Sequence, residues 1–146
     1  MRIVIQRVRS AEVERADQVI ARIGCGLVLL VGFERGDGEH LLAPALERIR
    51  NLRVFRNGES HFELSLADTG GELLIVPQFT LPANIHRGRR PDFSGALPAV
   101  SARPLFEAFI ETCHSASVPV QSGEFGTDML VRLENDGPVT LIVDLP

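Results

Sequence analysis

The run GLVLLVGF, residues Gly26–Phe33, decides the fold class of this chain. Eight uncharged residues, rich in branched apolar side chains, are typical of a strand that is buried on both faces. A second run, ELLIV at Glu72–Val76, has the same apolar character and is stopped by a proline, Pro77. Because strands of this kind lie inside a sheet, the sequence favours a layered fold with these two strands in its interior.

The remaining patterns predict two main helices and several shorter strands. Apolar residues recur at helical spacing over residues 40–53, and Pro44 indicates that the regular helix starts near it or bends there. Ser101 is the expected cap of a second helix that extends to about Ser115. The other expected strands are Arg2–Arg9, Glu12–Arg15, Val19–Ile23, Asn51–Phe55, Glu63–Leu66, Val118–Gln121, Asp128–Glu134 and Val139–Asp144, with Asn135–Pro138 as the turn between the last two. We predict one β-rich α/β domain over residues 1–146, with barrel-like or stacked sheets.

The charge balance limits the partners of this domain. With 15 basic and 19 acidic residues, the net charge is −4, which argues against a protein that coats nucleic acid by bulk electrostatics and against a DNA partner. A local basic patch that touches a few phosphates remains compatible with this charge. No apolar run approaches the ~20 residues that cross a bilayer, and the start, MRIVIQRVRS, is no secretory signal. We therefore expect a cytoplasmic protein without a membrane partner.

The residue types present exclude several kinds of chemistry. All 15 basic residues are arginine, and the chain contains no lysine, tyrosine or tryptophan, so a Schiff-base lysine or a tyrosine acid is excluded. The four histidines show no metal-ligand spacing, and we predict neither a metal nor a cofactor. Cys25 and Cys113 lie far apart and are expected to be reduced, buried thiols. A thiol hydrolase that uses either cysteine is a distant alternative.

The segment after the second apolar run carries candidate chemistry. Pro77 lacks the N–H that a central strand needs, so pairing should end there and leave nearby backbone amides free. Free amides can stabilise an oxyanion when an acyl group is attacked, and Gln78 and Thr80 add an amide and a hydroxyl. An arginine cluster, Arg87, Arg89 and Arg90, follows shortly, and the planar arginine side chain suits phosphate. Each feature taken alone is more simply read as a strand end or a solvated loop.

Seven motifs taken together resemble one family. They are QRV, GLVLLVG, NLRVF, GGELLIVPQFTL, RGRRPDF, GEFGTDM and NDGPVTLIVD, which occur in the order and at the spacing of the D-aminoacyl-tRNA deacylases, also known as the D-tyrosyl-tRNA deacylase family. The resemblance covers residues 1 to about 144. It implies a deacylase-type fold and hydrolysis of the ester between a D-amino acid, or a mischarged glycine on alanine tRNA, and the terminal adenosine of tRNA. It also implies a homodimer with the active site at the subunit interface.

The resemblance assigns roles to particular residues. Gly137 and Pro138 would form a cis peptide that reaches into the partner's pocket and excludes L-amino acids, with Arg7 bracing the turn. The pocket would contain Gln78, Phe79 and Thr80, and its main-chain N–H groups would form the oxyanion hole. An RNA 2′-hydroxyl would assist the hydrolysis, because neighbouring groups reach high effective molarities. The other implied contacts are Phe125 and Met129 near the terminal adenosine and Arg87, Arg89 and Arg90 on tRNA.

Pro77 departs from the family pattern, which usually has serine there. A proline at this position is similar to that of an animal relative that removes L-alanine from threonine tRNA, so proofreading of small L-amino acids is an alternative. An inactive module that binds the tRNA acceptor end is a further alternative. Asn84, Pro82 and Asp92 also differ from the residues common in the family, and they surround the arginine loop.

Overall fold

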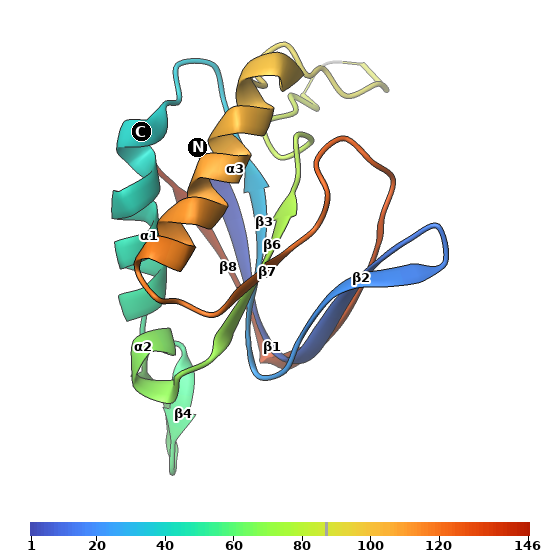
Figure 1. Ribbon diagram of the computed structural model, residues 1–146. Helices are drawn as coiled ribbons and strands as arrows, with labels where there is room; N and C mark the ends of the chain where they lie inside the picture. Colours follow the sequence, from blue (N-terminus) through green and yellow to red (C-terminus); the bar gives the residue numbers. More distant parts are fainter. Residues whose placement is uncertain (87) are drawn as a thin grey trace.

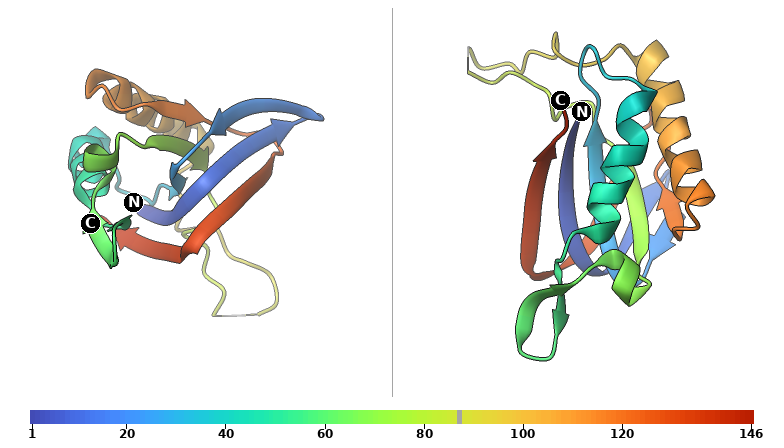
Figure 2. Two further views of the ribbon diagram at one scale, coloured as in Figure 1. Left: turned by 90° about the horizontal axis from the view of Figure 1, so that it is seen from below. Right: turned by 90° about the vertical axis from the view of Figure 1, so that its left-hand side faces the viewer.

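A curled sheet with two long helices on one face forms the molecule (Figures 1 and 2). The computed structural model describes residues 1–86 and 88–146. Three antiparallel pairs join β1 to β2, β3 and β8, whereas β3–β6 and β6–β7 are parallel. The strands of this sheet are β1 (Arg2–Arg15), β2 (Gln18–Ile23), β3 (Gly26–Gly32), β6 (Glu72–Pro77), β7 (Val120–Ser122) and β8 (Leu130–Asp144). The predicted β-rich, barrel-like α/β fold is confirmed.

The two apolar runs form β3 and β6, and both are buried on both faces as predicted. Their side chains alternate between two apolar clusters. Leu27, Leu29, Leu73 and Ile75 pack in the cluster under the helices, while Val28, Leu74 and Val76 pack in the cluster on the other face, inside the curl of β1, β2 and β8. Because successive strand residues point to opposite faces, an unbroken apolar run was needed to fill both clusters.

Both main helices are present; the first starts near Pro44 as predicted, and the second starts earlier than predicted. A 3₁₀ turn (Glu39–Leu41) leads into α1 (Leu42–Asn51), and Pro44 lies in the first turn, where helix N–H groups have no partner within the helix. The second long helix, α3 (Ala99–Ser115), begins two residues before Ser101. The prediction that Ser101 caps this helix is therefore wrong, because Pro98 occupies the cap position and no side chain caps the end.

The segment between α1 and β6 differs from its prediction. The expected strand Asn51–Phe55 is wrong, since α1 continues through Asn51 and the short strand β4 covers Phe55–Asn57. Its partner β5 (Ser60–Leu64) stops before Leu66, because Ser65 and Asp68 form a reciprocal capping box that starts the short helix α2 (Leu66–Thr69). Strands β4 and β5 form a two-stranded hairpin that projects beyond the helices (Figure 2).

The last strand corrects another prediction. The segments Asp128–Glu134 and Val139–Asp144 are one strand, β8, which runs antiparallel to β1 throughout and forms no hairpin. Its register jumps in the middle, because Val8 pairs with Asn135 while Gln6 pairs with Thr140. The four residues from 136 to 139 thus bulge out opposite Arg7, where a turn was expected.

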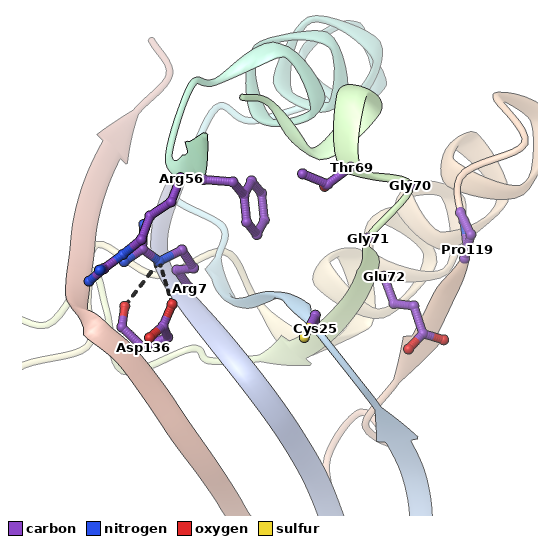
Figure 3. A pocket seen from close by; sticks show the side chains of 10 residues that line it. Arg7, Cys25, Arg56, Thr69, Gly70, Gly71, Glu72, Pro119 and Asp136 are labelled. Atoms are coloured by element: carbon purple, nitrogen blue, oxygen red, sulfur yellow. Dashed lines mark hydrogen bonds and ion pairs between the residues drawn. The ribbon is translucent and has the colours of Figure 1, made fainter. Parts of the chain in front are cut away.

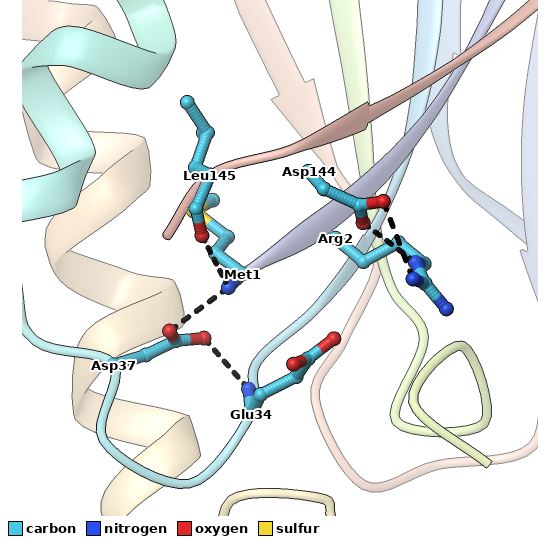
Figure 4. A network of polar contacts seen from close by, with 6 residues as sticks. All are labelled: Met1, Arg2, Glu34, Asp37, Asp144 and Leu145. Atoms are coloured by element: carbon cyan, nitrogen blue, oxygen red, sulfur yellow. Dashed lines mark hydrogen bonds and ion pairs between the residues drawn. The ribbon is translucent and has the colours of Figure 1, made fainter. Parts of the chain in front are cut away.

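Polar contacts hold the two chain ends together at the end of the β1–β8 pair (Figure 4). The Met1 ammonium donates to Asp37 Oδ1 at 2.8 Å and to the Leu145 carbonyl at 3.0 Å. Beside it, Arg2 Nε lies 2.6 Å from Asp144 Oδ1, and this hydrogen bond lowers the pKa of the Asp144 carboxyl. These contacts fix the first residues of β1 against the last residues of β8.

Candidate functional site

A pocket lies at the end of β6, where the sheet pairing stops. Its volume is about 520 Å³, and it brings together five of the predicted site residues, Pro77, Gln78, Phe79, Phe125 and Met129. The other lining residues are Val76, Leu97, Ala99, Ala102, Gly126, Thr127, Asp128 and Val131. The lining therefore combines the end of β6, the start of α3 and the loop that leads into β8.

The backbone at this strand end is arranged as the proline predicts. The Gln78 N–H donates to the Val31 carbonyl at 2.7 Å, and beyond it the chain turns, with the Leu81 N–H donating to the Gln78 carbonyl at 3.2 Å. Within the described residues, the N–H groups of Phe79 and Thr80 make no recorded hydrogen bond. Two adjacent main-chain donors are thus unpaired, among the described residues, where the chain leaves the pocket at Phe79.

The side chains here are poorly suited to covalent catalysis. Gln78 Nε2 donates a hydrogen bond to Thr80 Oγ1. An amide does not accept a proton at neutral pH, so this contact orients the hydroxyl without activating it as a nucleophile. Thr80 is exposed and lies outside the pocket lining. The available chemistry is hydrogen-bond donation from the backbone to a developing negative charge.

Another part of the pocket lining comes from the loop from Gly123 to Met129, which the sequence only partly predicted. Phe125 packs against Phe106 of α3, with ring centroids 6.0 Å apart. Met129 Sδ accepts from the Glu124 N–H at 3.2 Å. Sequence reasoning missed Ala99 and Ala102, although their three-residue spacing on a helix places them on the same face.

The Gly137–Pro138 bulge is held by Arg7, whose side chain is only 3% exposed. Arg7 Nε donates to the Asp136 carbonyl at 3.0 Å and lies 3.3 Å from Asp136 Oδ2, while Nη1 donates to the Val54 carbonyl. The peptide bond between Gly137 and Pro138 is cis. Both residues are exposed on the surface. Figure 3 shows Arg7 and Asp136 together at the edge of a neighbouring pocket that also contains Cys25.

Within one chain the two signature segments do not meet. Arg7 pairs with Leu27, which pairs with Leu73, so the bulge is level with the start of β6. The pocket begins at Val76 and Pro77, three to four residues further along, or about 10–13 Å at the usual rise of a strand. A single chain therefore presents the pocket and the bulge at opposite ends of β6.

The arginine loop, which lies between Asn84 and Asp92, follows the pocket residues Gln78 and Phe79 in the sequence. Asn84 and Asp92 pair across its base, with hydrogen bonds of 2.8 and 3.0 Å between their backbones. The backbone N–H and hydroxyl of Ser94 donate to the Asp92 carboxylate and lower its pKa. Arg89 and Arg90 are exposed, and the predicted contact Arg87 lies outside the described residues. The two residues that pair at the base of this loop, Asn84 and Asp92, are thus both departures from the family pattern.

Replacing Arg7 with methionine is expected to destabilise the protein by about 2–3 kcal/mol, because the Val54 and Asp136 carbonyls lose a charged donor. Urea unfolding of the two proteins measures this difference. Arg9, which lies 3.4 Å from Asp136 but is 74% exposed, supplies the control, since Arg9→Met should cost well under 1 kcal/mol. Equal effects of the two substitutions would contradict the bracing role of Arg7.

The two cysteines should differ in reactivity. Burial raises the pKa of the Cys113 thiol to about 12, so the nucleophilic thiolate is nearly absent at neutral pH, whereas Cys25 is exposed and not buried as predicted. Iodoacetamide should therefore modify Cys25 in the folded protein and reach Cys113 only after unfolding, as peptide mass spectrometry can show. Cys25→Ser should keep the full hydrolytic rate. A large loss of rate in this variant would support the thiol-hydrolase alternative.

Among residues 1–86 and 88–146, no three His, Cys, Asp or Glu side chains come together as a metal site requires. No helix in the same ranges is long and apolar enough to span a bilayer. The absence of a cofactor remains a prediction.

A strand-end pocket beside unpaired backbone donors, without a conventional nucleophile, suits chemistry in which hydrogen bonds stabilise a developing negative charge. The chain belongs to the D-Tyr-tRNA(Tyr) deacylase family, whose sequence pattern matches residues 4–144. It is 46% identical to a D-aminoacyl-tRNA deacylase of Chlorobaculum parvum over 100% of this chain and 99% of the relative. A D-aminoacyl-tRNA deacylase of Lactobacillus helveticus is 44% identical over 99% of this chain and all of its own. The predicted family and enzyme class are confirmed.

Solved structures agree on the fold. The structure titled c-Myc DNA Unwinding Element Binding Protein superposes with a TM-score of 0.93 at 35% identity, covering 100% of this chain and 99% of its own. A probable eukaryotic D-amino acid tRNA deacylase superposes with a TM-score of 0.86 over 99% of this chain and 98% of its own. At 19% identity, this second likeness supports the fold alone.

Proposed function

We propose that this protein hydrolyses the ester of D-aminoacyl-tRNA, and of glycine mischarged on alanine tRNA, as a homodimer that spares L-aminoacyl-tRNA. The observation that carries the proposal is the pair of free main-chain N–H groups, at Phe79 and Thr80, beside the pocket at the end of β6. In this reaction water attacks the ester carbonyl and the tRNA oxygen leaves. Both N–H groups would donate to the oxyanion that develops on the carbonyl oxygen.

The substrate would supply the catalytic side group that the pocket lacks. The terminal ribose of tRNA carries a 2′-hydroxyl next to the ester, and a group held so close can reach an effective molarity of ~10⁵–10⁸ M. Such assistance restricts the reaction to RNA, because DNA lacks this hydroxyl. The exposed Arg89 and Arg90 lie in the loop that follows the catalytic segment, where they could contact phosphates of the acceptor end.

The separation of the two signature segments supports the proposed dimer. Gly137 and Pro138 are exposed and lie about 10–13 Å along the sheet from the pocket of their own chain. This separation supports a filter that is supplied to the pocket by a second copy. A fixed backbone segment placed close to the substrate Cα rejects every L-residue irrespective of its side chain, which attractive contacts alone cannot do.

A mixed dimer can test this arrangement directly. One subunit carries Ala99→Trp, which fills its pocket, and the other carries Gly137→Ala, which disturbs its bulge. Two different affinity tags allow the mixed dimer to be purified. Its one open pocket belongs to the Gly137→Ala subunit and faces the intact bulge of the partner, so L-aminoacyl-tRNA should be rejected. Rejection lost in the mixed dimer, or a protein that stays monomeric, would contradict the proposal.

Pro77 supports a second candidate activity. Its ring lines the pocket, so a change at this position alters the surface that meets the substrate. Cleavage of L-alanine from threonine tRNA would follow if this change admits a small L-side chain. Replacing Pro77 with serine, the usual residue of the family, should abolish such cleavage and leave the D-specific activity within about threefold.

An inactive tRNA-binding module is the remaining alternative. It predicts retained binding of uncharged tRNA with no turnover of any ester. We keep the prediction that DNA is no partner, because a net charge of −4 gives little attraction for a duplex. A gel-shift assay with DNA and tRNA of equal length, at physiological salt, tests that prediction. A cytoplasmic location agrees with a substrate used in translation and stays a prediction.

A further inference from the structure

We infer that Arg103, an exposed residue of α3, is a positioning residue that holds the Phe125 wall of the pocket in place. The inference rests on the proposed function, because it assumes that this pocket receives the acceptor end of tRNA. Arg103 itself is absent from the pocket lining, so it would act on the substrate through Phe125. None of the sequence motifs singles it out.

Two contacts connect Arg103 to the same residue. Arg103 Nη2 donates to the Phe125 carbonyl at 3.1 Å, and the guanidinium carbon lies 5.1 Å from the centroid of the Phe125 ring. The planar guanidinium suits this combination, because it can stack on an aromatic face and donate from its edge. Three residues further along the same side of α3, Phe106 contributes a ring that lies 6.0 Å from that of Phe125. Phe125 is thus held from two positions on one helix.

The wall needs such support because it has no regular secondary structure. Residues 123–129 lie between β7 and β8 without helix or strand hydrogen bonds. The remaining recorded contacts that tie this segment to other elements lie near its start, where the Gly123 N–H donates to the Ile75 carbonyl at 2.9 Å and Glu124 pairs with Arg15. At Gly126, an added Cβ would lie 3.2 Å from Arg103 Nη2, so the loop packs closely against the guanidinium. Arg103 therefore fixes the middle of the wall.

The consequence for the enzyme is a specific kinetic signature. Phe125 lines the pocket but belongs to a different segment from the backbone donors of Phe79 and Thr80. A wall that moves weakens substrate binding, while the donors that meet the oxyanion stay in place. Arg103→Met should therefore raise KM about tenfold, which corresponds to ~1.4 kcal/mol, and leave kcat within about twofold. Arg103→Lys should recover part of the loss, since an ammonium keeps the attraction to the ring.

Two further measurements separate positioning from direct contact with tRNA. The first is the slope of log KM plotted against log salt concentration. If Arg103 binds phosphate, removing it should reduce this slope by about one unit, whereas removing a positioning arginine should leave the slope unchanged. In a Phe125→Leu background, Arg103→Met should add less than threefold to KM, because its effect passes through Phe125. A changed slope, or full additivity of the two substitutions, would overturn the inference.

Amide hydrogen exchange gives a readout that does not require activity. Peptides covering residues 123–129 should exchange about tenfold faster in Arg103→Met, and those covering α1 should be unaffected. Arg48→Met on α1 is the matched control, since Arg48 is exposed and makes no recorded contact within the described part of the chain. Unchanged exchange in residues 123–129 would overturn the inference. If the wild-type protein hydrolyses no ester, the proposed function fails while this exchange experiment still decides the role of Arg103.

Discussion

Replacing Gly137 with alanine is expected to make the protein hydrolyse L-aminoacyl-tRNA, with discrimination between D- and L-substrates falling about 10- to 100-fold. Gly137 has φ +130°, and an added Cβ would lie 2.9 Å from both Arg7 Nη2 and Val139 Cγ2. Arg7 is held by hydrogen bonds to the Val54 and Asp136 carbonyls, so we expect the bulge itself to shift. A backbone conformation open essentially only to glycine costs other residues ~1–3 kcal/mol, and each 1.4 kcal/mol corresponds to a factor of ten.

The measurement compares deacylation rates of the two enantiomers for the wild type and the variant. Gly36→Ala is the matched control, because Gly36 also has a positive φ, +98°, but an added Cβ there meets no atom within 4 Å. The control should lose stability without any change in the ratio of the two rates. A Gly137→Ala protein that keeps the wild-type ratio would show that the bulge is not the filter.

Removing the Phe79 N–H is expected to lower kcat about 100- to 1000-fold, the usual cost of losing one oxyanion donor. Incorporating phenyllactic acid at position 79 replaces this N–H by an ester oxygen and keeps the side chain. Substrate binding should change little, because the donor meets a negative charge that is present mainly in the transition state. Single-turnover rates and KM, measured on the same preparation, separate the two effects.

Phe93 provides a closely matched control for this substitution. Its ring lies 5.3 Å from that of Phe79, and its N–H also has no recorded partner among the described residues. In both cases the preceding carbonyl accepts one backbone hydrogen bond, at Gln78 from Leu81 and at Asp92 from Asn84. The same ester at position 93, which lies outside the pocket lining, should leave kcat within about twofold. Equal losses at positions 79 and 93 would argue against the oxyanion role.

The parts of the fold that the sequence predicted are those with a strong local signal. The apolar runs of β3 and β6 and the proline at the end of β6 each fix a structure through their own residues. The bulge in β8 could not be predicted in this way, because Asn135–Pro138 has the composition of a hairpin turn. The structure shows instead that residues before and after this segment both pair antiparallel with β1, so the strand continues in one direction and does not turn back.

The candidate site was predictable in part for the same reason. Pro77–Thr80 follows a recognisable strand end, so the free N–H groups could be expected before the structure was known. Ala99, Ala102 and Arg103 carry no chemical signature, and only the packing of α3 against residues 123–129 gives them a place at the pocket. The separation of the pocket from Gly137 likewise depends on the strand register, which could not be predicted from the sequence.

The most direct test of the central claim is a parallel deacylation assay with purified protein. Four substrates are compared, a D-aminoacyl-tRNA, its L-enantiomer, glycine on alanine tRNA and L-alanine on threonine tRNA. We predict rapid hydrolysis of the D-aminoacyl and glycyl esters, with the L-enantiomer left intact. Equal hydrolysis of both enantiomers, or turnover of none of the four esters, would contradict the account.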